Sequence, residues 1–187
     1  MERYNAECYN AYSFPKNKNK DKDCCDKARK VLLECGFNPE PAIFAIDDDY
    51  VEPQQCFDLD RLVIDTTDLC RPIVKIEFSS LICFEAESND NGDDEIEVKL
   101  LFELERICNG KKECVQNWYY VKEFETENEL EVEISEPFTV TFCDRTCPGC
   151  CEYKMVVKGI DFDGKFEFLN VVKPNLSAIA QGLCSDR

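Results

Sequence analysis

The clearest pattern in this chain is an alternation of apolar and mostly acidic residues between positions 95 and 106. Every second residue is apolar: Ile96, Val98, Leu100, Phe102 and Leu104. Successive side chains of a strand point to opposite faces, so a period of two gathers the apolar residues on one face. This segment is predicted to be a β-strand with one buried face and one solvated face.

Shorter runs of the same kind recur along most of the chain, separated by turn signals. The dipeptides Asn91-Gly92, Asn109-Gly110 and Asp163-Gly164 are typical of hairpins. The apolar pattern begins at residues 29–36, which end in a turn glycine, and the other predicted strand segments are residues 42–46, 62–65, 72–79, 81–85, 114–124, 130–134, 138–142, 151–162 and 165–172. They correspond to about nine or ten strands without an amphipathic helix, which predicts an all-β fold, an antiparallel β-sandwich of the jelly-roll kind.

The ends of the chain differ from this middle part. Residues 1–30 are polar, with a run of Lys, Asn and Asp and no apolar periodicity, and are predicted to be a flexible N-terminal connector arm. Residues 31–173 are expected to form the sandwich, because a chain of 187 residues can bury one real core. Residues 174–187 are expected to be a C-terminal tail.

Charge and hydropathy exclude two classes of partner. The net charge of −17 argues against nucleic acid, since phosphate binding needs the opposite sign. The chain has no 18-residue apolar run and no apolar stretch near its N-terminus suited to a secretory signal. We therefore expect no membrane partner, and synthesis in the cytoplasm without a signal peptide.

The charge is unevenly distributed along the chain. Residues 16–30 contain seven Lys and Arg residues and three Asp residues, a net charge of +4. The rest of the chain therefore carries a net charge of −21. A basic arm on an acidic body suits contact between copies of the chain, and a solvated polar linker is the alternative interpretation.

The composition also argues against catalysis. The chain contains no histidine, so Ser–His and Cys–His catalysis, imidazole ligands and a general base poised near neutral pH are all missing. Its seven glycines are scattered singly and form no phosphate-binding loop. We predict that the protein is not an enzyme and has no catalytic residues and no cofactor.

Fourteen cysteines are the main chemical signal of the chain. Two pairs are adjacent, Cys24-Cys25 and Cys150-Cys151, and neighbouring residues of an extended chain point in opposite directions. A doublet in an arm can therefore reach two partners at once, which favours cross-linking. Because persistent disulfides are rare in a reducing cytoplasm, the thiols either bind metal or meet an oxidant later, after release by lysis.

Metal binding is the main rival interpretation. Cys143, Cys147, Cys150 and Cys151 form Cys-x3-Cys-x2-Cys-Cys, but only Cys147 and Cys150 have zinc-knuckle spacing and no second such pair follows. No metal site is therefore predicted. The other interpretation is that further cysteines are small hydrophobic residues or make local bridges: Cys56, Cys70, Cys83, Cys108 and Cys114.

Two acidic segments, residues 47–49 and 90–94, are candidates for calcium-binding loops. Neither has the spaced oxygen ligands and the positioned glycine of an EF-hand loop. Both are interpreted as solvated acidic loops.

The cysteine spacing resembles a known family. A polar arm with Cys24-Cys25, nine residues and then Cys35 resembles the N-terminal connector of bacterial endospore appendage subunits. The stretches IDTTDLCRPIVKIEFSSLI and CCEYKMVV also look like an uncharacterised cysteine-rich family of spore-forming clostridia.

The resemblance implies a function. Appendage subunits stack into helical fibres by strand augmentation between jelly-roll bodies, and the arm reaches subunits further along, where its cysteines oxidise onto body cysteines. By position, Cys24 and Cys25 would be the donors, Cys35 one acceptor, and one cysteine among Cys143, Cys147, Cys150 and Cys151 the other.

We therefore expect a non-enzymatic structural subunit whose partner is itself. It would assemble into a disulfide-cross-linked, pilus-like extracellular fibre, an endospore appendage on the spore surface, held by strand augmentation and inter-subunit disulfides. The alternatives are a spore-coat or exosporium lattice protein, a cysteine-rich metal-binding module and a monomeric adhesin.

Overall fold

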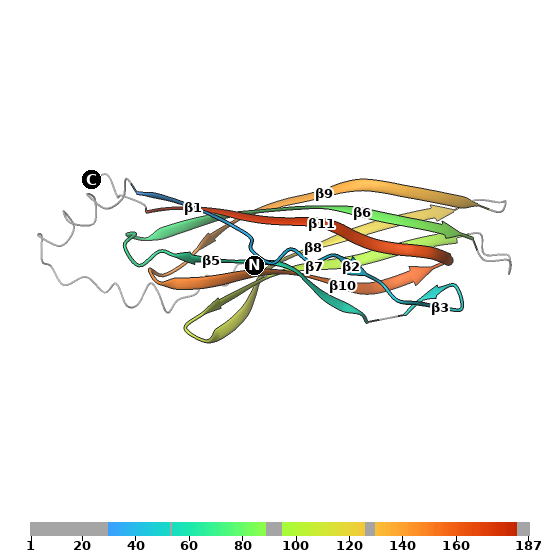
Figure 1. Cartoon of the computed structure of the whole chain (residues 1–187), viewed down its shortest axis with the longest axis horizontal. Helices are drawn as coiled ribbons and strands as arrows, with labels where there is room; N and C mark the ends of the chain where they lie inside the picture. The colour runs from blue at the N-terminus through green and yellow to red at the C-terminus, as the bar shows by residue number, and fades with distance from the viewer. Residues whose placement is uncertain (1–29, 53, 89–94, 126–129, 183–187) are drawn as a thin grey trace, which may run out of the picture.

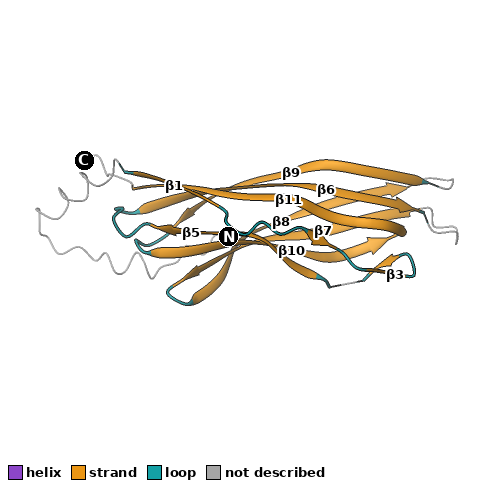
Figure 2. Ribbon diagram, viewed as in Figure 1, coloured by secondary structure: helices purple, strands orange, loops and turns teal. Residues whose placement is uncertain are grey.

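A computed structural model describes residues 30–52, 54–88, 95–125 and 130–182. Within these residues the regular structure consists of strands, as Figure 2 shows, and no helix is long and apolar enough to cross a bilayer. The eleven strands are β1 (Val31–Cys35), β2 (Ala42–Ile43), β3 (Ile46–Asp47), β4 (Tyr50–Val51), β5 (Cys56–Asp65), β6 (Pro72–Glu87), β7 (Glu95–Cys108), β8 (Lys111–Glu125), β9 (Glu131–Arg145), β10 (Cys150–Asp163) and β11 (Lys165–Gly182).

Nine of these strands form two antiparallel sheets that pack face to face along one long axis (Figure 1), and β3 and β4 pair with each other in a separate two-stranded sheet. Sheet 1 has the order β1-β11-β6-β9, with β2 also paired to β11, and sheet 2 has the order β5-β10-β7-β8. If the eight main strands are numbered along the chain, these orders become 1-8-3-6 and 2-7-4-5. This is a jelly roll, so the predicted all-β sandwich is confirmed.

The alternating segment at 95–106 is confirmed as β7, whose apolar face is fully buried. Phe102 lies at the centre of the core and packs on both Phe78 of β6 and Phe138 of β9, with its ring 4.1 Å from that of Phe138. Because β6 and β9 belong to the opposite sheet, these aromatic contacts join the two layers.

Two pairs of predicted strands are each one long strand. The segments 72–79 and 81–85 merge into β6, and β9 runs through Pro137, which lies opposite Leu81. A proline lacks an amide hydrogen, but an edge strand tolerates it because only one side of β9 is paired. Proline and serine therefore do not end these strands.

The predicted tail beginning at residue 174 is wrong for residues 174–182, which belong to β11. The strand continues because Leu176, Ala178 and Ala180 resume the inward alternation and are almost fully buried. A bulge before Asn175, where Lys173 has a φ of 52°, displaces the register next to Pro174 and hides this continuity in the sequence. Of the predicted arm, residues 1–29 lie outside the described part, as do residues 183–187.

Candidate functional site

The free cysteines of the described residues face away from the core. Their side chains lie on the outer faces of the two sheets: Cys35, Cys83 and Cys143 on sheet 1, and Cys56, Cys114 and Cys150 on sheet 2. Five of them are exposed, and Cys83 is partly covered, 3.4 Å from the Ser135 hydroxyl. Free cysteine is usually among the most buried residue types, so this placement needs a chemical reason.

Four of these thiols sit on the strands that border the sheets. Cys35 lies on β1 and Cys143 on β9, the two edges of sheet 1. Cys56 lies on β5 and Cys114 on β8, the two edges of sheet 2. Each of these four strands carries one free thiol, and an edge strand whose backbone groups are free is a place where another chain can pair.

The six thiols cannot pair with one another inside one body. Cys35 and Cys143 lie on strands three spacings apart, about 14 Å, whereas a disulfide needs Cα atoms within about 7 Å. Cys143 lies opposite Lys75 of β6, and Cys83 is eight residues further along β6, so Cys83 and Cys143 are about 27 Å apart along the strand direction. On sheet 2, Cys56 lies opposite Lys158 of β10, which is eight residues from Cys150, so these two thiols are separated by a similar distance. Thiols on different sheets point in opposite directions, away from the sandwich.

The structure separates the four cysteines of the segment 143–151. Cys143 faces outward from sheet 1, Cys150 faces outward from sheet 2, and Cys147 is disulfide-bonded. Cys151 is buried and bonded to Cys108 of the same chain, so we remove it from the inter-chain candidates. These four sulfur atoms therefore do not converge as metal ligands do. Cys24 and Cys25 lie outside the described residues.

The interpretation of other cysteines as small hydrophobic residues also needs correction. Cys56 and Cys114 are exposed and Cys83 only partly covered, so none of the three fills the core. Cys70 is disulfide-bonded, and Cys108 makes a bridge across neighbouring strands. The two adjacent cysteines Cys150 and Cys151 have different roles because successive side chains of a strand alternate: Cys151 points inward and Cys150 outward.

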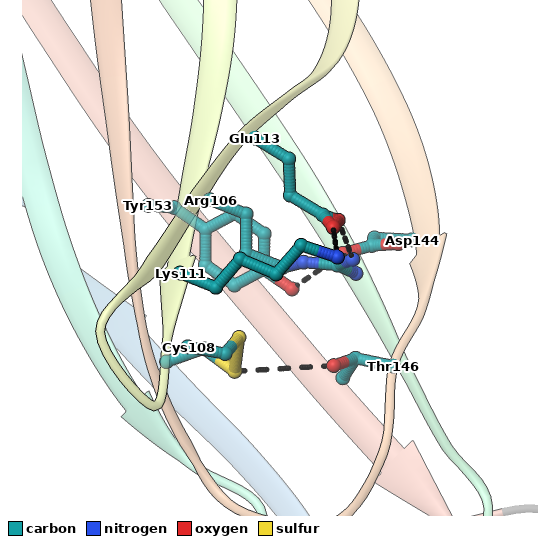
Figure 3. Close-up of polar contacts among 8 residues, drawn as sticks. Arg106, Cys108, Lys111, Glu113, Asp144, Thr146 and Tyr153 are labelled. Atoms are coloured by element: carbon teal, nitrogen blue, oxygen red, sulfur yellow. Dashed lines mark hydrogen bonds and ion pairs between the residues drawn. A yellow bond between two sulfur atoms is a disulfide. The ribbon is translucent and has the colours of Figure 1, made fainter. Parts of the chain in front are cut away.

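The Cys108–Cys151 bridge joins β7 and β10 as a direct cross-strand pair with Cα atoms 4.5 Å apart. Figure 3 shows a buried polar cluster beside it, built from β7, β8, β9 and β10. Arg106 donates from Nη1 to Asp144 Oδ2 at 2.5 Å and from Nη2 to Glu113 Oε2 at 2.8 Å. The Tyr153 hydroxyl donates to the same Asp144 oxygen at 2.8 Å. Since Asp144 is in sheet 1 and the others in sheet 2, the cluster clamps the sheets together.

The charges of this clamp are mutually balanced. Burial alone would lower the pKa of Arg106, but the Asp144 carboxylate and its hydrogen bonds raise it above its usual range. Burial, and then the charge of Asp144, raises the pKa of the Tyr153 hydroxyl strongly, so it stays a donor. All these groups are engaged with each other, which makes the cluster a structural clamp.

Glu113 gives the clamp an acid-sensitive part. Its hydrogen bond from Arg106, followed by that from Lys111, lowers its pKa below the usual 4.5. The ionised form thus stabilises the fold above that pH, and the contribution disappears as pH falls through the lowered pKa. We expect Glu113→Gln to cost less than about 1 kcal/mol at neutral pH, because the side chain is partly exposed.

Urea unfolding followed by circular dichroism at several pH values checks this expectation. The difference between the wild type and Glu113→Gln should shrink steadily below the usual carboxyl pKa. A difference that stays constant down to strongly acidic pH would show that Glu113 acts without its charge.

The thiols on the edges of sheet 2 are less acidic than usual. Partial shielding from water, and then the charges of Asp58 and Glu103, raise the pKa of Cys56, although Lys158 opposes this. Shielding and the Glu103 carboxylate also raise the pKa of Cys114. Because the thiolate is the reactive form, the raised pKa lowers the fraction of each thiol that is reactive near neutral pH.

One group of possible metal ligands occurs among the described residues, the carboxylates of Glu95, Glu123 and Glu125. Burial and the neighbouring charge of Glu123 raise the pKa of Glu95, as expected where like charges meet.

The acidic segment at 47–49 forms a hairpin turn between β3 and β4, where Asp48 and Asp49 have φ values of 47° and 70°. The segment 90–94 lies outside the described residues.

A buried carboxylate holds the strand that carries Cys35. A bulge at Leu59 turns Asp60 inward, where it is only 3% exposed. Its oxygens accept from the backbone N–H groups of Asn38, Arg61 and Leu176. The segment after β1 also covers the edge of β5, through Phe37 N–H to the Arg61 carbonyl and Glu40 N–H to the Leu59 carbonyl.

Comparisons with known proteins give a family but no named activity. No curated protein matches the chain. Eiger TNF from S. frugiperda is similar over 85% of this chain and 97% of its own, at 7% identity and a TM-score of 0.35. A chain of infectious bursal disease virus, Gx strain, is similar over 82% of this chain at 9% identity and a TM-score of 0.36, and the match spans 37% of the viral chain.

A family model described as a domain of unknown function, DUF4489, matches residues 29–181, which include all eleven strands except the final residue of β11. The chain therefore belongs to the DUF4489 family.

Proposed function

We propose that this protein is a non-enzymatic structural subunit that assembles with copies of itself into a covalently cross-linked, pilus-like extracellular fibre. The observation that carries the proposal is the position of the free thiols: six point outward, and no two of them can meet inside one body. Solvent-exposed thiols that cannot reach one another within one copy are suited to form disulfides with other copies.

Edge strands supply the geometry for such bonds. Opposite residues of paired antiparallel strands have Cα atoms about 4.5–5.5 Å apart, within the range of a disulfide. Stacked sheet faces are about 10 Å apart, which is too far. The Cys108–Cys151 bridge, with 4.5 Å between its Cα atoms, is an example within this fold. Outward thiols on edge strands therefore favour strand augmentation between bodies over stacking of faces.

The resemblance of the arm to endospore appendage subunits supplies the biological setting. Chains made under reducing conditions would keep their thiols and assemble through backbone pairing, and oxidation after lysis of the mother cell would lock the fibre on the spore surface. In this proposal Cys24 and Cys25 of the arm also reach body cysteines of other copies.

A spore-coat or exosporium lattice protein would use the same thiols in a sheet-like arrangement, and electron microscopy of purified material distinguishes it from a fibre. A metal-binding module predicts stoichiometric zinc by elemental analysis and unfolding by a chelator. The separation of Cys143 from Cys150 onto opposite outer faces favours the fibre over this module.

Electrophoresis of the purified chain after oxidation by air, with and without thiol reductant, tests the proposal. We expect a ladder of high-mass species without reductant that collapses to the 21.6 kDa monomer when reductant is added. Replacing all six outward cysteines and the arm doublet by serine should abolish the ladder while circular dichroism still reports a folded β-protein. Wild-type protein that stays at monomer size without reductant would contradict the proposal.

A further inference from the structure

The two edges of sheet 1 are built so that one copy can continue the sheet of the next. In the described part of the chain, β1 and β9 border this sheet and each has one unpaired side. Every neighbouring pair in β1-β11-β6-β9 is antiparallel, so β1 and β9 run in opposite directions. A β9 edge placed beside the β1 edge of another copy therefore continues the antiparallel pattern without a break.

Sheet 2 does not offer the same continuation. Its β5 edge is already used, because Phe37 and Glu40 donate backbone hydrogen bonds to the carbonyls of Arg61 and Leu59. The pKa of each of its two edge thiols, Cys56 and Cys114, is raised by partial shielding from water, which lowers the reactive thiolate fraction.

The register places the two edge thiols of sheet 1 on one face. Cys35 lies opposite Ser177, Ser177 opposite Glu77, and Glu77 opposite Thr141 of β9. Cys143 is two residues beyond Thr141, and an even offset keeps its side chain on the same outer face as Cys35. An odd offset would have put the two sulfur atoms on opposite faces of the continued sheet.

We infer that Cys35 on β1 of one copy forms a disulfide with Cys143 on β9 of the next copy, as a cross-strand pair in a sheet shared by both bodies. This inference rests on the proposed function and names the body-to-body bond of the fibre. The offset of two residues shifts each copy by about 7 Å along the strands. A heterologous contact with such a shift does not close into a ring and gives an open polymer.

The neighbours of the two thiols suit this pairing. In the register set by the disulfide, Arg145 comes opposite Leu33, which is 66% exposed in the single copy. Glu34 comes opposite Asp144, whose charge is already balanced by Arg106. Lys75, beside Cys143 on β6, adds a cation next to the thiol. The contact would thus cover an apolar side chain that is exposed in the single copy.

The bond forms by thiol–disulfide exchange with a small disulfide such as oxidised glutathione. The Cys143 thiolate attacks the reagent and releases one glutathione thiolate. The Cys35 thiolate of the next copy then attacks the mixed disulfide and releases the second. Two protein thiols lose two electrons and two protons in total, and one disulfide reagent is reduced to two thiols.

A complementation experiment tests the inference in the full chain, with Cys8, Cys24, Cys25, Cys70, Cys147 and Cys184 changed to serine to remove other linkages. We expect this parent to form a ladder with oxidised glutathione. Cys35→Ser alone and Cys143→Ser alone should stay monomeric. An equal mixture of the two should stop at a dimer, because one chain supplies only Cys143 and the other only Cys35. Cys56→Ser with Cys114→Ser is the matched control, and it should form the ladder as the parent does.

Mass spectrometry then identifies the bond. Trypsin releases residues 123–145, which contain Cys143 as their one cysteine, and residues 31–61, which contain Cys35 and Cys56. The dimer should yield these two peptides joined by a disulfide that reductant cleaves.

A ladder that persists in Cys35→Ser or Cys143→Ser through other cysteine pairs overturns this inference but leaves the proposed function standing. If the parent stays monomeric while the wild type forms a ladder, the copies are linked through the cysteines replaced in the parent, and this inference fails alone. A wild type that stays monomeric defeats both.

Discussion

Replacing Asp144 with alanine is expected to destabilise the fold by about 3–5 kcal/mol, because it leaves the Arg106 charge buried with one carboxylate fewer. Arg106 and Asp144 have side chains only 10% and 9% exposed, and Tyr153 loses its acceptor at the same time. The expected effect is a large fraction of the stability of a single domain. Urea unfolding at neutral pH, followed by circular dichroism, measures it.

The exposed pair Lys75–Glu77 provides the matched control, since its side chains are 49% and 54% exposed. Glu77→Ala should cost less than about 1 kcal/mol. Replacing Arg106 and Asp144 together by leucine should cost clearly less than the two single alanine changes combined, because no unpaired charge remains. An Asp144→Ala protein as stable as Glu77→Ala would show that the buried cluster does not clamp the sheets.

Replacing Gly36 with alanine is expected to destabilise the fold by about 2–4 kcal/mol through a clash with a fixed carboxylate. A Cβ atom on Gly36 would lie 2.0 Å from one oxygen of Asp60. The carboxylate cannot move away without releasing the N–H groups of Asn38, Arg61 and Leu176. Since Gly36 follows Cys35 directly, the same change should loosen the end of β1 and slow cross-linking through Cys35.

A double-mutant cycle with Asp60→Ala checks the proposed cause. Asp60→Ala removes the clashing atoms, so Gly36→Ala should cost much less in that background than in the wild type. Equal costs in both backgrounds would mean that the clash is relieved elsewhere. Gly110→Ala is no substitute as a control, because Gly110 has a φ of 76° and is strained by any side chain.

The strands of this fold were largely predictable because their period of two extends over many residues. The segment at 95–106 needed no tertiary information, since an apolar residue recurs at every second position from Ile96 to Leu104. Strand ends were less predictable. Pro137 and Pro174 suggested breaks, but an edge position accommodates the first and a bulge the second.

The arrangement of the cysteines was predictable only in part. Alternation explains why Cys150 and Cys151 face opposite ways, and it follows from the backbone of a strand alone. The pairing of Cys151 with Cys108 depends on the register of β10 against β7, which are joined by a jelly-roll crossing and not by a hairpin. The presence of one outward thiol on each edge strand depends on strand order, which no local pattern encodes.

The buried polar groups were not predictable from the pattern at all. Asp144 lies at the end of a strand of alternating residues, and Arg106 lies between Glu105 and Ile107 near the end of another. Their partnership arises because β7 and β9 come from different sheets and approach each other at one end of the sandwich. The sequence signal that remains is weak: a charged residue on the apolar side of a strand needs a partner when it is buried.

The most direct test is peptide mapping of oxidised polymer grown from an equal mixture of ordinary and isotope-labelled chains. Our account predicts that bonds at the outward cysteines join labelled to unlabelled peptides, whereas the Cys108–Cys151 bond joins peptides of one label only. It is contradicted if every disulfide of the material joins peptides of the same label, or if the outward cysteines all remain reduced.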